Sequence, residues 1–258
     1  MFARIAGRYD LNNRLHSLWR DQAWRREAVR AGGASRGDRV LDAACGTGDL
    51  AGLFARAGAG QVVGVDFCPE MLDAARRKFP RERIRWLPGD ATALPLGDGE
   101  FDVVSIAFGI RNIADPSLAL AEFRRVLRPG GRLLSRWHPF RSRYGAHIHS
   151  AIGIPFAHLL FNETDLVRAY CRQLRERYDS LPPTMRPAYD RSTTLDELEY
   201  HLNRKTVGEM RAALDRAGFA LLERRFYRGT RPVRLPRRLP ERWVDYLVDY
   251  EVQIRAVR

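Results

Sequence analysis

Short apolar runs alternate with amphipathic segments through the first half of the chain. The runs are rich in Val, Leu, Ile and Phe and are too short for buried helices. This alternation is typical of βαβ units, which build a parallel sheet with helices on both faces. The strands predicted here are residues 39–43, 61–66, 83–87, 101–108 and 132–137, and the helices are residues 50–57, 69–79 and 117–127. Pro129-Gly130-Gly131 is expected to stop the last of these helices.

The pattern changes at both ends of the chain. Residues 2–30 are amphipathic and helical, and the alternation stops after Trp137. It resumes with a helix at 206–217, capped by Gly218, and with strands at 219–227 and 250–257. We therefore expect an α/β fold with seven mostly parallel strands in a single domain. Its predicted parts are a helical lid (1–36), a cofactor-binding core (37–138), an inserted helical cap (139–204) and a C-terminal helix with the last two strands (205–258).

Charge and composition leave several partners open. The formal net charge is +13, and Lys78 and Lys205 are the only lysines among the 44 cationic residues. Such a bias toward arginine fits a codon preference as well as a basic binding surface. Residues 228–242 contain six arginines and three prolines and are predicted to form an exposed loop. With no membrane-length apolar run, no secretory signal and no metal-type cysteine pairing, we expect a cytoplasmic protein.

Residues 40–50, Val-Leu-Asp-Ala-Ala-Cys-Gly-Thr-Gly-Asp-Leu, carry the first candidate chemistry. They follow a predicted strand and open a helix. Small residues let the backbone turn sharply and approach a ligand, and the helix start offers free N–H groups. Because Gly46, Gly48 and Ala51 also fit the dinucleotide fingerprint, this run alone does not choose between two cofactor classes.

Carboxylates at three strand ends favour a cofactor without phosphate. Asp66 ends the second strand, where it can accept hydrogen bonds from ribose hydroxyls. Asp90 follows the third strand beside Ala91 and could hold an adenine amino group. Asp42 ends the first strand, where a carboxylate would oppose a pyrophosphate but suit an ammonium or a sulfonium.

These segments resemble class I methyltransferases that use S-adenosylmethionine (SAM). More narrowly, three regions are similar to the ubiquinone/menaquinone biosynthesis C-methyltransferases. They are residues 2–26, with Arg-Tyr-Asp-Leu-Asn-Asn; Ile-Ala-Phe-Gly-Ile-Arg-Asn at 106–112; and residues 119–134. The resemblance implies a Rossmann-like class I methyltransferase fold with SAM as cofactor. The predicted cofactor-binding residues are Asp42, Ala44, Gly46, Thr47, Gly48, Asp66, Phe67, Asp90, Ala91 and Ala107.

The chain departs from the family after its fifth predicted strand. Family members continue with Glu-Phe-Ser, whereas this chain reads Ser-Arg-Trp-His-Pro at 135–139, and the family's Tyr-Leu-Pro cap signature is not recognisable. Serine is also common in the family at the position of Ala107. Because the cap shapes the acceptor pocket, these departures concern the acceptor rather than the cofactor.

Candidate catalytic residues are named for the reaction that the resemblance implies. Methyl transfer depends chiefly on positioning, and a general base would activate a hydroquinone ring. His138 directly follows a strand end, and Tyr9 and Asp10 could fold over the cofactor. The predicted catalytic residues are His138, Tyr9 and Asp10, and the predicted substrate-binding residues are Arg111, Asn112, Trp137 and His158. No residue set suggests a metal site.

Three functions remain open at this point. The first is C-methylation of a hydroquinone ring in menaquinone or ubiquinone biosynthesis. The second is methylation of another lipid or natural product, and the third is an RNA-binding methyltransferase, for which the net charge is the main support. For the first we expect an apolar small-molecule acceptor and peripheral contact with an anionic membrane. Nucleic acid is the weaker choice of partner, and a homodimer is compatible with the sequence.

Overall fold

The computed structural model describes residues 20–107, 109–113, 115–137, 206–228, 231–236 and 250–257, together with residues 165, 168–169, 172, 239 and 244. In these residues one mixed sheet of eight strands forms the centre, in the order β3-β2-β1-β4-β5-β8-β6-β7. The strands are β1 (Arg39–Ala43), β2 (Gln61–Asp66), β3 (Ile84–Pro88), β4 (Phe101–Ala107), β5 (Leu127–Trp137), β6 (Phe219–Arg228), β7 (Arg231–Val233) and β8 (Tyr250–Val257).

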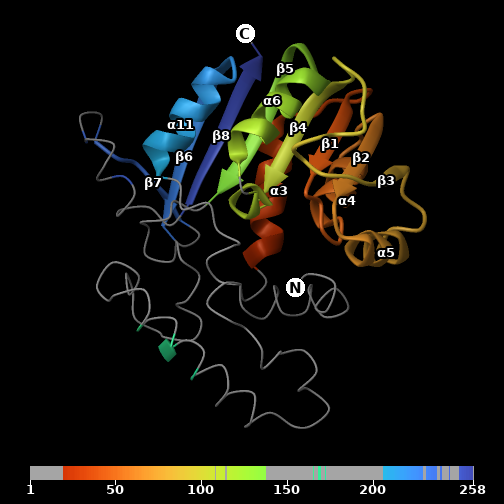
Figure 1. Ribbon diagram of the computed structural model, residues 1–258. Coiled ribbons are helices and arrows are strands. Elements are labelled where there is room, and N and C mark those ends of the chain that lie inside the picture. Colours follow the sequence, from red (N-terminus) through yellow and green to blue (C-terminus); the bar gives the residue numbers. More distant parts are fainter. Residues whose placement is uncertain are drawn as a thin grey trace.

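The sheet has a parallel part and an antiparallel part. β3, β2, β1, β4 and β5 pair in parallel, and β8 then pairs antiparallel with both β5 and β6. Figure 1 shows the sheet running from β3 at the right to β7 at the left, with the β8 arrow pointing opposite to those of β4 and β5. All seven predicted strands are present, so the predicted fold class is confirmed.

Neighbouring residues of each central strand face opposite helical layers. Val40 of β1 packs in one core cluster with the helices α3 (Arg20–Gly32) and α4 (Asp49–Arg56), while Leu41 packs in the other cluster with α6 (Pro116–Val126) and α11 (Val207–Arg216). The same alternation occurs in β2, β4 and β5. A strand buried on both faces must be apolar at successive positions, which explains the short unbroken runs in the sequence.

The structure departs from the prediction by more than one or two residues in two places. β5 begins at Leu127, directly after α6, and includes the Pro-Gly-Gly segment that was predicted to be a connection. Leu127 pairs with Phe101, and the register shifts before Arg132 pairs with Val103. Residues 128–131 therefore leave the regular ladder as a bulge, which is how proline and two glycines are accommodated within a strand.

The arginine-rich stretch after β6 is the second difference. It was predicted to be a loop, but Arg231–Val233 forms β7 and pairs antiparallel with the end of β6. The helix α11 agrees closely with prediction. Its N-cap Thr206 accepts from the Glu209 N–H in a capping box, and Gly218 after the helix has a φ of 82°.

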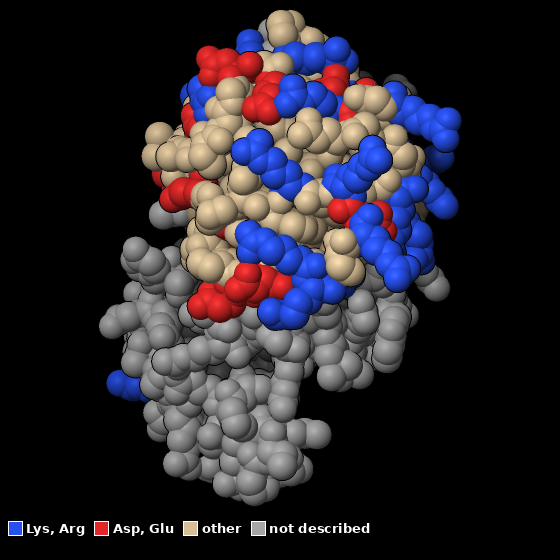
Figure 2. Space-filling model, turned by 90° about the vertical axis from the view of Figure 1, so that its right-hand side faces the viewer, with Lys and Arg blue, Asp and Glu red and all other residues tan. Residues whose placement is uncertain are grey.

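The predicted lid and cap lie largely outside the described residues. Residues 1–19 and almost all of 139–204 belong to that undescribed part of the chain. In the part that the structure describes, none of the helices combines the length and apolar character needed to span a bilayer. On the face that carries β3, basic side chains are spread over the surface with acidic side chains between them (Figure 2).

Candidate cofactor site

The parallel strands bring the predicted cofactor residues to one edge of the sheet. Each strand from β1 to β5 ends at this carboxyl edge, where ligands bind in open α/β sheets. Asp66 is the last residue of β2, and Ala107 is the last residue of β4. The Gly89 N–H donates to the Asp66 carbonyl oxygen at 3.1 Å, so the next residue, Asp90, lies close to the end of β2.

The turn between β1 and α4 has a left-handed backbone at three positions. The φ angles are 51° at Ala44, 56° at Gly46 and 78° at Gly48. A Cβ atom added at Gly48 would lie 2.3 Å from the Trp86 ring, whereas one added at Gly46 would meet nothing within 4 Å. Gly48 is therefore required for packing within the protein, and Gly46 leaves open space that a ligand can enter.

The Asp42 side chain bonds to the first turn of the helix that follows, α4. It is buried, its Oδ2 accepts from the Ala51 N–H at 3.1 Å, and its Oδ1 accepts from the Ser105 Oγ at 2.8 Å. The N-cap of α4 is Gly48, which has no side chain, so the Asp42 carboxylate caps the helix from the neighbouring strand. Burial raises the pKa of Asp42 to about 7, against the lowering effect of the Ser105 hydrogen bond.

The Asp66 side chain bonds to the glycine turn itself. Its Oδ2 accepts from the Gly46 N–H at 2.7 Å, and its Oδ1 accepts from the Cys68 N–H at 2.9 Å. Burial raises the pKa of Asp66 above its usual value. The Phe67 N–H also bonds to this carboxylate, and because a carboxylate has about four acceptor positions, acceptor capacity remains for the ribose. Phe67, the next residue, is 64% exposed and offers an apolar ring at this edge.

Three charged residues join the start of α4 to two other helices. The Asp49 carboxylate pairs with Arg25 of α3 at 2.9 Å and with Lys78 of α5 (Pro69–Lys78). Lys78 Nζ also lies 3.5 Å from Oγ1 of the buried Thr47. This network fixes the first turn of α4, and it could not be predicted from the sequence because its members are far apart along the chain.

Asp90 differs from the other two carboxylates because it is exposed. Its Oδ1 accepts from both the N–H and the Oγ1 of Thr92, each at 2.8 Å. Its Oδ2 has no hydrogen-bond partner among the residues that the structure describes. Asp90 therefore keeps one carboxylate oxygen available at the carboxyl edge.

A short 3₁₀ helix, η2 (Gly109–Asn112), lies against the glycine turn. A Cβ atom added at Gly109 would be 2.5 Å from the Ala44 Cβ, so the backbone of η2 approaches the turn closely. Arg111 and Asn112 are thereby brought near the predicted cofactor residues. The side chain of Arg111 is outside the described part.

The other predicted substrate-binding and catalytic residues lie at the end of the described residues or outside them. Trp137 ends β5 at the carboxyl edge, but its side chain is not described. Tyr9, Asp10, His138 and His158 all lie outside the described residues. Their roles stay predictions.

The chemistry of this edge suits a ligand that carries a positive charge and hydroxyl groups. Asp42, Asp66 and Asp90 are acceptors, and three carboxylates would disfavour a pyrophosphate at the same position. Burial raises the pKa of the Cys45 thiol, which keeps it neutral and poorly nucleophilic. Among the described residues, no group of three or more His, Cys, Asp and Glu side chains could hold a metal ion. The residues present therefore fit SAM.

Comparison with solved structures supports the fold. A SAM-dependent methyltransferase from Thermotoga maritima aligns with a TM-score of 0.60 and 17% identity, covering 100% of this chain and 98% of that one. At an identity this low, the comparison supports a shared architecture and nothing more specific. The alignment agrees with the strand order described above.

Comparison of sequences identifies the family. The demethylmenaquinone methyltransferase of Thermus thermophilus is 53% identical over 137 residues, which are 52% of this chain and 62% of that protein. The ubiquinone/menaquinone biosynthesis C-methyltransferase of Bdellovibrio bacteriovorus is 47% identical over 138 residues, 52% of this chain and 58% of that protein. This chain thus matches less than two thirds of each relative. A profile of the ubiE/COQ5 methyltransferase family matches residues 1–139, and the chain belongs to that family.

Proposed function

We propose that the protein is a SAM-dependent methyltransferase that methylates a ring carbon of a hydroquinone in menaquinone or ubiquinone biosynthesis. The observation that carries this proposal is the family match over residues 1–139, because the matched relatives are named for these quinones. The matched region contains the whole carboxyl edge of the parallel strands, from β1 to the end of β5.

SAM would bind along the carboxyl edge of the parallel strands. Asp66 would accept from the ribose hydroxyls, and Asp90 would accept from the adenine amino group. The open space at Gly46 lets the cofactor approach the backbone, and the buried Asp42 holds the turn through its hydrogen bond from the Ala51 N–H. The other proposed cofactor residues are Ala44, Thr47, Gly48, Phe67, Ala91 and Ala107.

The protein's part in the reaction is positioning and proton removal. SAM supplies a methyl group on a sulfonium, which is a good leaving group, so aligning the acceptor carbon with that methyl supplies much of the catalysis. A general base that removes a phenol proton makes the neighbouring ring carbon nucleophilic. His138 is the first candidate for this base, with Tyr9 and Asp10 next, and Arg111, Asn112, Trp137 and His158 are proposed to contact the acceptor.

The proposed acceptor is an apolar small molecule, which has consequences for location. A prenylated quinone resides in a membrane, so we propose a cytoplasmic enzyme that contacts an anionic membrane surface peripherally. The arginines of residues 228–242 are the candidates for that contact. A homodimer fits this proposal equally well, and nucleic acid has no role in it.

A second candidate function is methylation of another lipid or natural product. It is favoured by the end of the family match at residue 139, which leaves the predicted cap outside the matched region. A different cap would leave the cofactor site intact and change the acceptor pocket.

Incubation of the full chain with methyl-labelled SAM and demethylmenaquinol tests the proposal. We expect label to appear in menaquinol, and a control with boiled protein should give none. Binding of S-adenosylhomocysteine without transfer to any quinol would favour the second candidate. Failure to bind either SAM or S-adenosylhomocysteine would contradict both candidates.

A further inference from the structure

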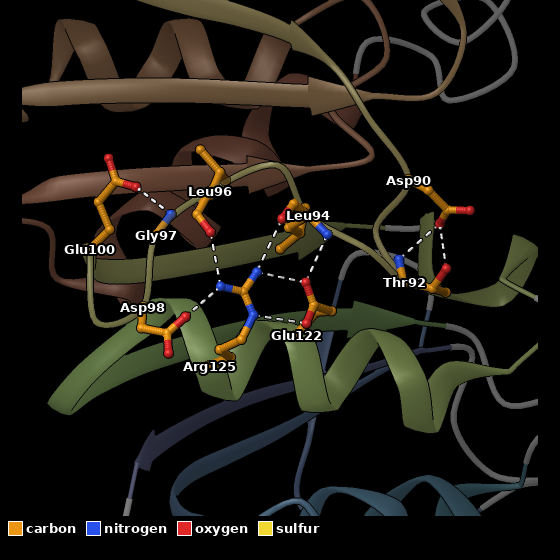
Figure 3. A network of polar contacts seen from close by, with 9 residues as sticks. All are labelled: Asp90, Thr92, Leu94, Leu96, Gly97, Asp98, Glu100, Glu122 and Arg125. Carbon is orange, nitrogen blue, oxygen red and sulfur yellow. Dashed lines mark hydrogen bonds and ion pairs between the residues drawn. The ribbon is translucent and has the colours of Figure 1, made fainter.

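The connection between β3 and β4 has no regular secondary structure of its own. It spans residues 89–100 and contains, directly after Gly89, the two residues proposed for the adenine end of the cofactor, Asp90 and Ala91. A recognition group on such a segment needs support from another element to hold its position. Figure 3 shows that this support comes from the α6 helix.

The guanidinium of Arg125, on α6, makes five hydrogen bonds. Its NH2 donates to the Leu94 carbonyl at 3.0 Å and its NH1 donates to the Leu96 carbonyl at 2.9 Å. NH1 also donates to Asp98 Oδ1 at 2.6 Å, while Nε and NH2 donate to the two Glu122 oxygens at 2.9 and 2.8 Å. The planar fork of arginine can satisfy these directions together, which a lysine ammonium cannot.

Glu122 completes the attachment from the same helix. Its Oε2 accepts from the Leu94 N–H at 2.7 Å, so Leu94 is held through both its N–H and its carbonyl. The Arg125 backbone carbonyl also accepts from the Gly99 N–H at 2.9 Å. Arg125 in turn holds the pKa of Glu122 below its usual value, which keeps that carboxylate charged.

The fixed point at Leu94 is joined directly to Asp90. The Ala93 N–H donates to the Asp90 carbonyl at 3.0 Å, and the Thr92 N–H donates to Asp90 Oδ1 at 2.8 Å. Leu94 is also buried in the core cluster on the α6 side. The compact turn at residues 90–93 therefore has one end at β3 and the other at the Arg125 contact.

We infer that Arg125 is a positioning residue that sets adenine selectivity by holding the segment that presents Asp90. This inference rests on the proposed function, since it assigns an adenine contact to Asp90. Arg125 itself would not touch the cofactor. Its loss would let residues 90–94 move and would weaken the contact with the adenine amino group more than any contact made by β1 or β2.

The test compares two ligands that differ at the purine 6-position. The full chain is titrated calorimetrically with S-adenosylhomocysteine and with S-inosylhomocysteine, which lacks the amino group. We expect wild type to prefer the adenosyl ligand by about 10-fold to 100-fold, the range for a hydrogen bond to a charged group. Arg125→Gln should reduce the preference to about 3-fold or less, through weaker adenosyl binding.

Two further variants make the result specific. Arg128→Gln removes the same charge from an exposed arginine that pairs with Asp102, and it should keep the wild-type preference. Arg125→Lys keeps the charge without the fork and should give an intermediate preference, so it serves also if Arg125→Gln does not fold. Circular dichroism checks the fold of each variant.

The inference is overturned if Arg125→Gln and Arg125→Lys bind S-adenosylhomocysteine with the wild-type preference. It is also overturned if they lose affinity equally for both ligands, because a general structural defect would do that. If the wild-type protein binds both ligands equally, Asp90 does not contact the adenine amino group, and the inference is overturned as well. A wild-type protein that binds neither would instead contradict the proposed function.

Discussion

The turn after β1 and the segment after β3 both carry carboxylates, but they use them differently. At the turn after β1, the carboxylates of Asp42 from β1 and Asp66 from β2 are buried and accept backbone N–H groups, so they stabilise the turn. After β3, Asp90 is exposed, and the segment that carries it is held by hydrogen bonds from Arg125 of the α6 helix. We therefore expect changes at the β1 turn to affect folding, and changes after β3 to affect ligand selectivity.

The largest expected effect is a pH dependence of stability caused by Asp42. Its pKa is about 7 in the folded protein and about 3.9 when unfolded. Between these values the folded protein keeps a proton that the unfolded chain releases. The stability from neutral Asp42 is therefore complete below about pH 4 and is lost as the pH rises to 7, by at most about 4 kcal/mol.

Asp42→Asn should remove this dependence because the amide stays neutral. It can keep both contacts, since the Ser105 hydroxyl can accept as well as donate. Urea unfolding between pH 4 and pH 8 should show the variant gaining stability relative to wild type as the pH rises. Asp73→Asn, at an exposed ion pair, is the control and should give a flat difference. A flat difference for Asp42→Asn would contradict the assignment.

The next effect separates the two glycines of the β1 turn. Gly48→Ala combines a left-handed backbone with a clash against the Trp86 ring, so its free energy of unfolding should fall by about 3 kcal/mol. Gly46→Ala has the left-handed backbone without a clash and should lose about 1 kcal/mol. Chemical denaturation measures both, and equal losses would show that packing against Trp86 is unimportant.

Gly46→Ala should nevertheless be the more informative variant for binding. Its new methyl group would occupy the open space at the turn, so S-adenosylhomocysteine affinity should fall by about 10-fold or more while the protein stays folded. Gly130→Ala is a matched control, because Gly130 has a φ of 73° and open space but lies away from the carboxyl edge. Unchanged affinity in Gly46→Ala would argue against a ligand at this turn.

The smallest expected effect on stability is at Asp90. Because Asp90 is exposed, Asp90→Asn should change the free energy of unfolding by no more than about 0.5 kcal/mol. Adenine selectivity should still decrease, since the charged acceptor becomes a neutral amide. Thermal unfolding and paired titrations with the adenosyl and inosyl ligands measure the two properties. A large loss of stability without a change in selectivity would contradict this prediction, because Asp90 would then support the fold, as Asp42 does, and not ligand recognition.

The sequence predicted the parts of the fold that local patterns control. The buried strands, α4, α6 and α11 follow from apolar periodicity and from capping residues such as Thr206. The start of β5 was missed because proline and glycine usually end strands, and here they sit in a bulge. β7 was missed because a three-residue strand depends on its partner β6 more than on its own composition.

The candidate site shows the same division. Glycines and strand-end carboxylates are visible in the sequence because each marks a boundary between elements. Ser105, the partner of Asp42, and Arg125 are not, since they act on residues 63 and 31 positions away. Such pairs become visible only when the sheet brings β4 beside β1 and places α6 beside the β3–β4 connection.

The decisive measurement is a crystal structure of the full chain with S-adenosylhomocysteine. It should show the ribose hydroxyls bonded to the Asp66 carboxylate, the adenine amino group at the free oxygen of Asp90, and the ligand passing Gly46. A ligand bound elsewhere, or one bound at this edge with its adenine turned away from Asp90, would contradict the central claim that these strand ends form the SAM site.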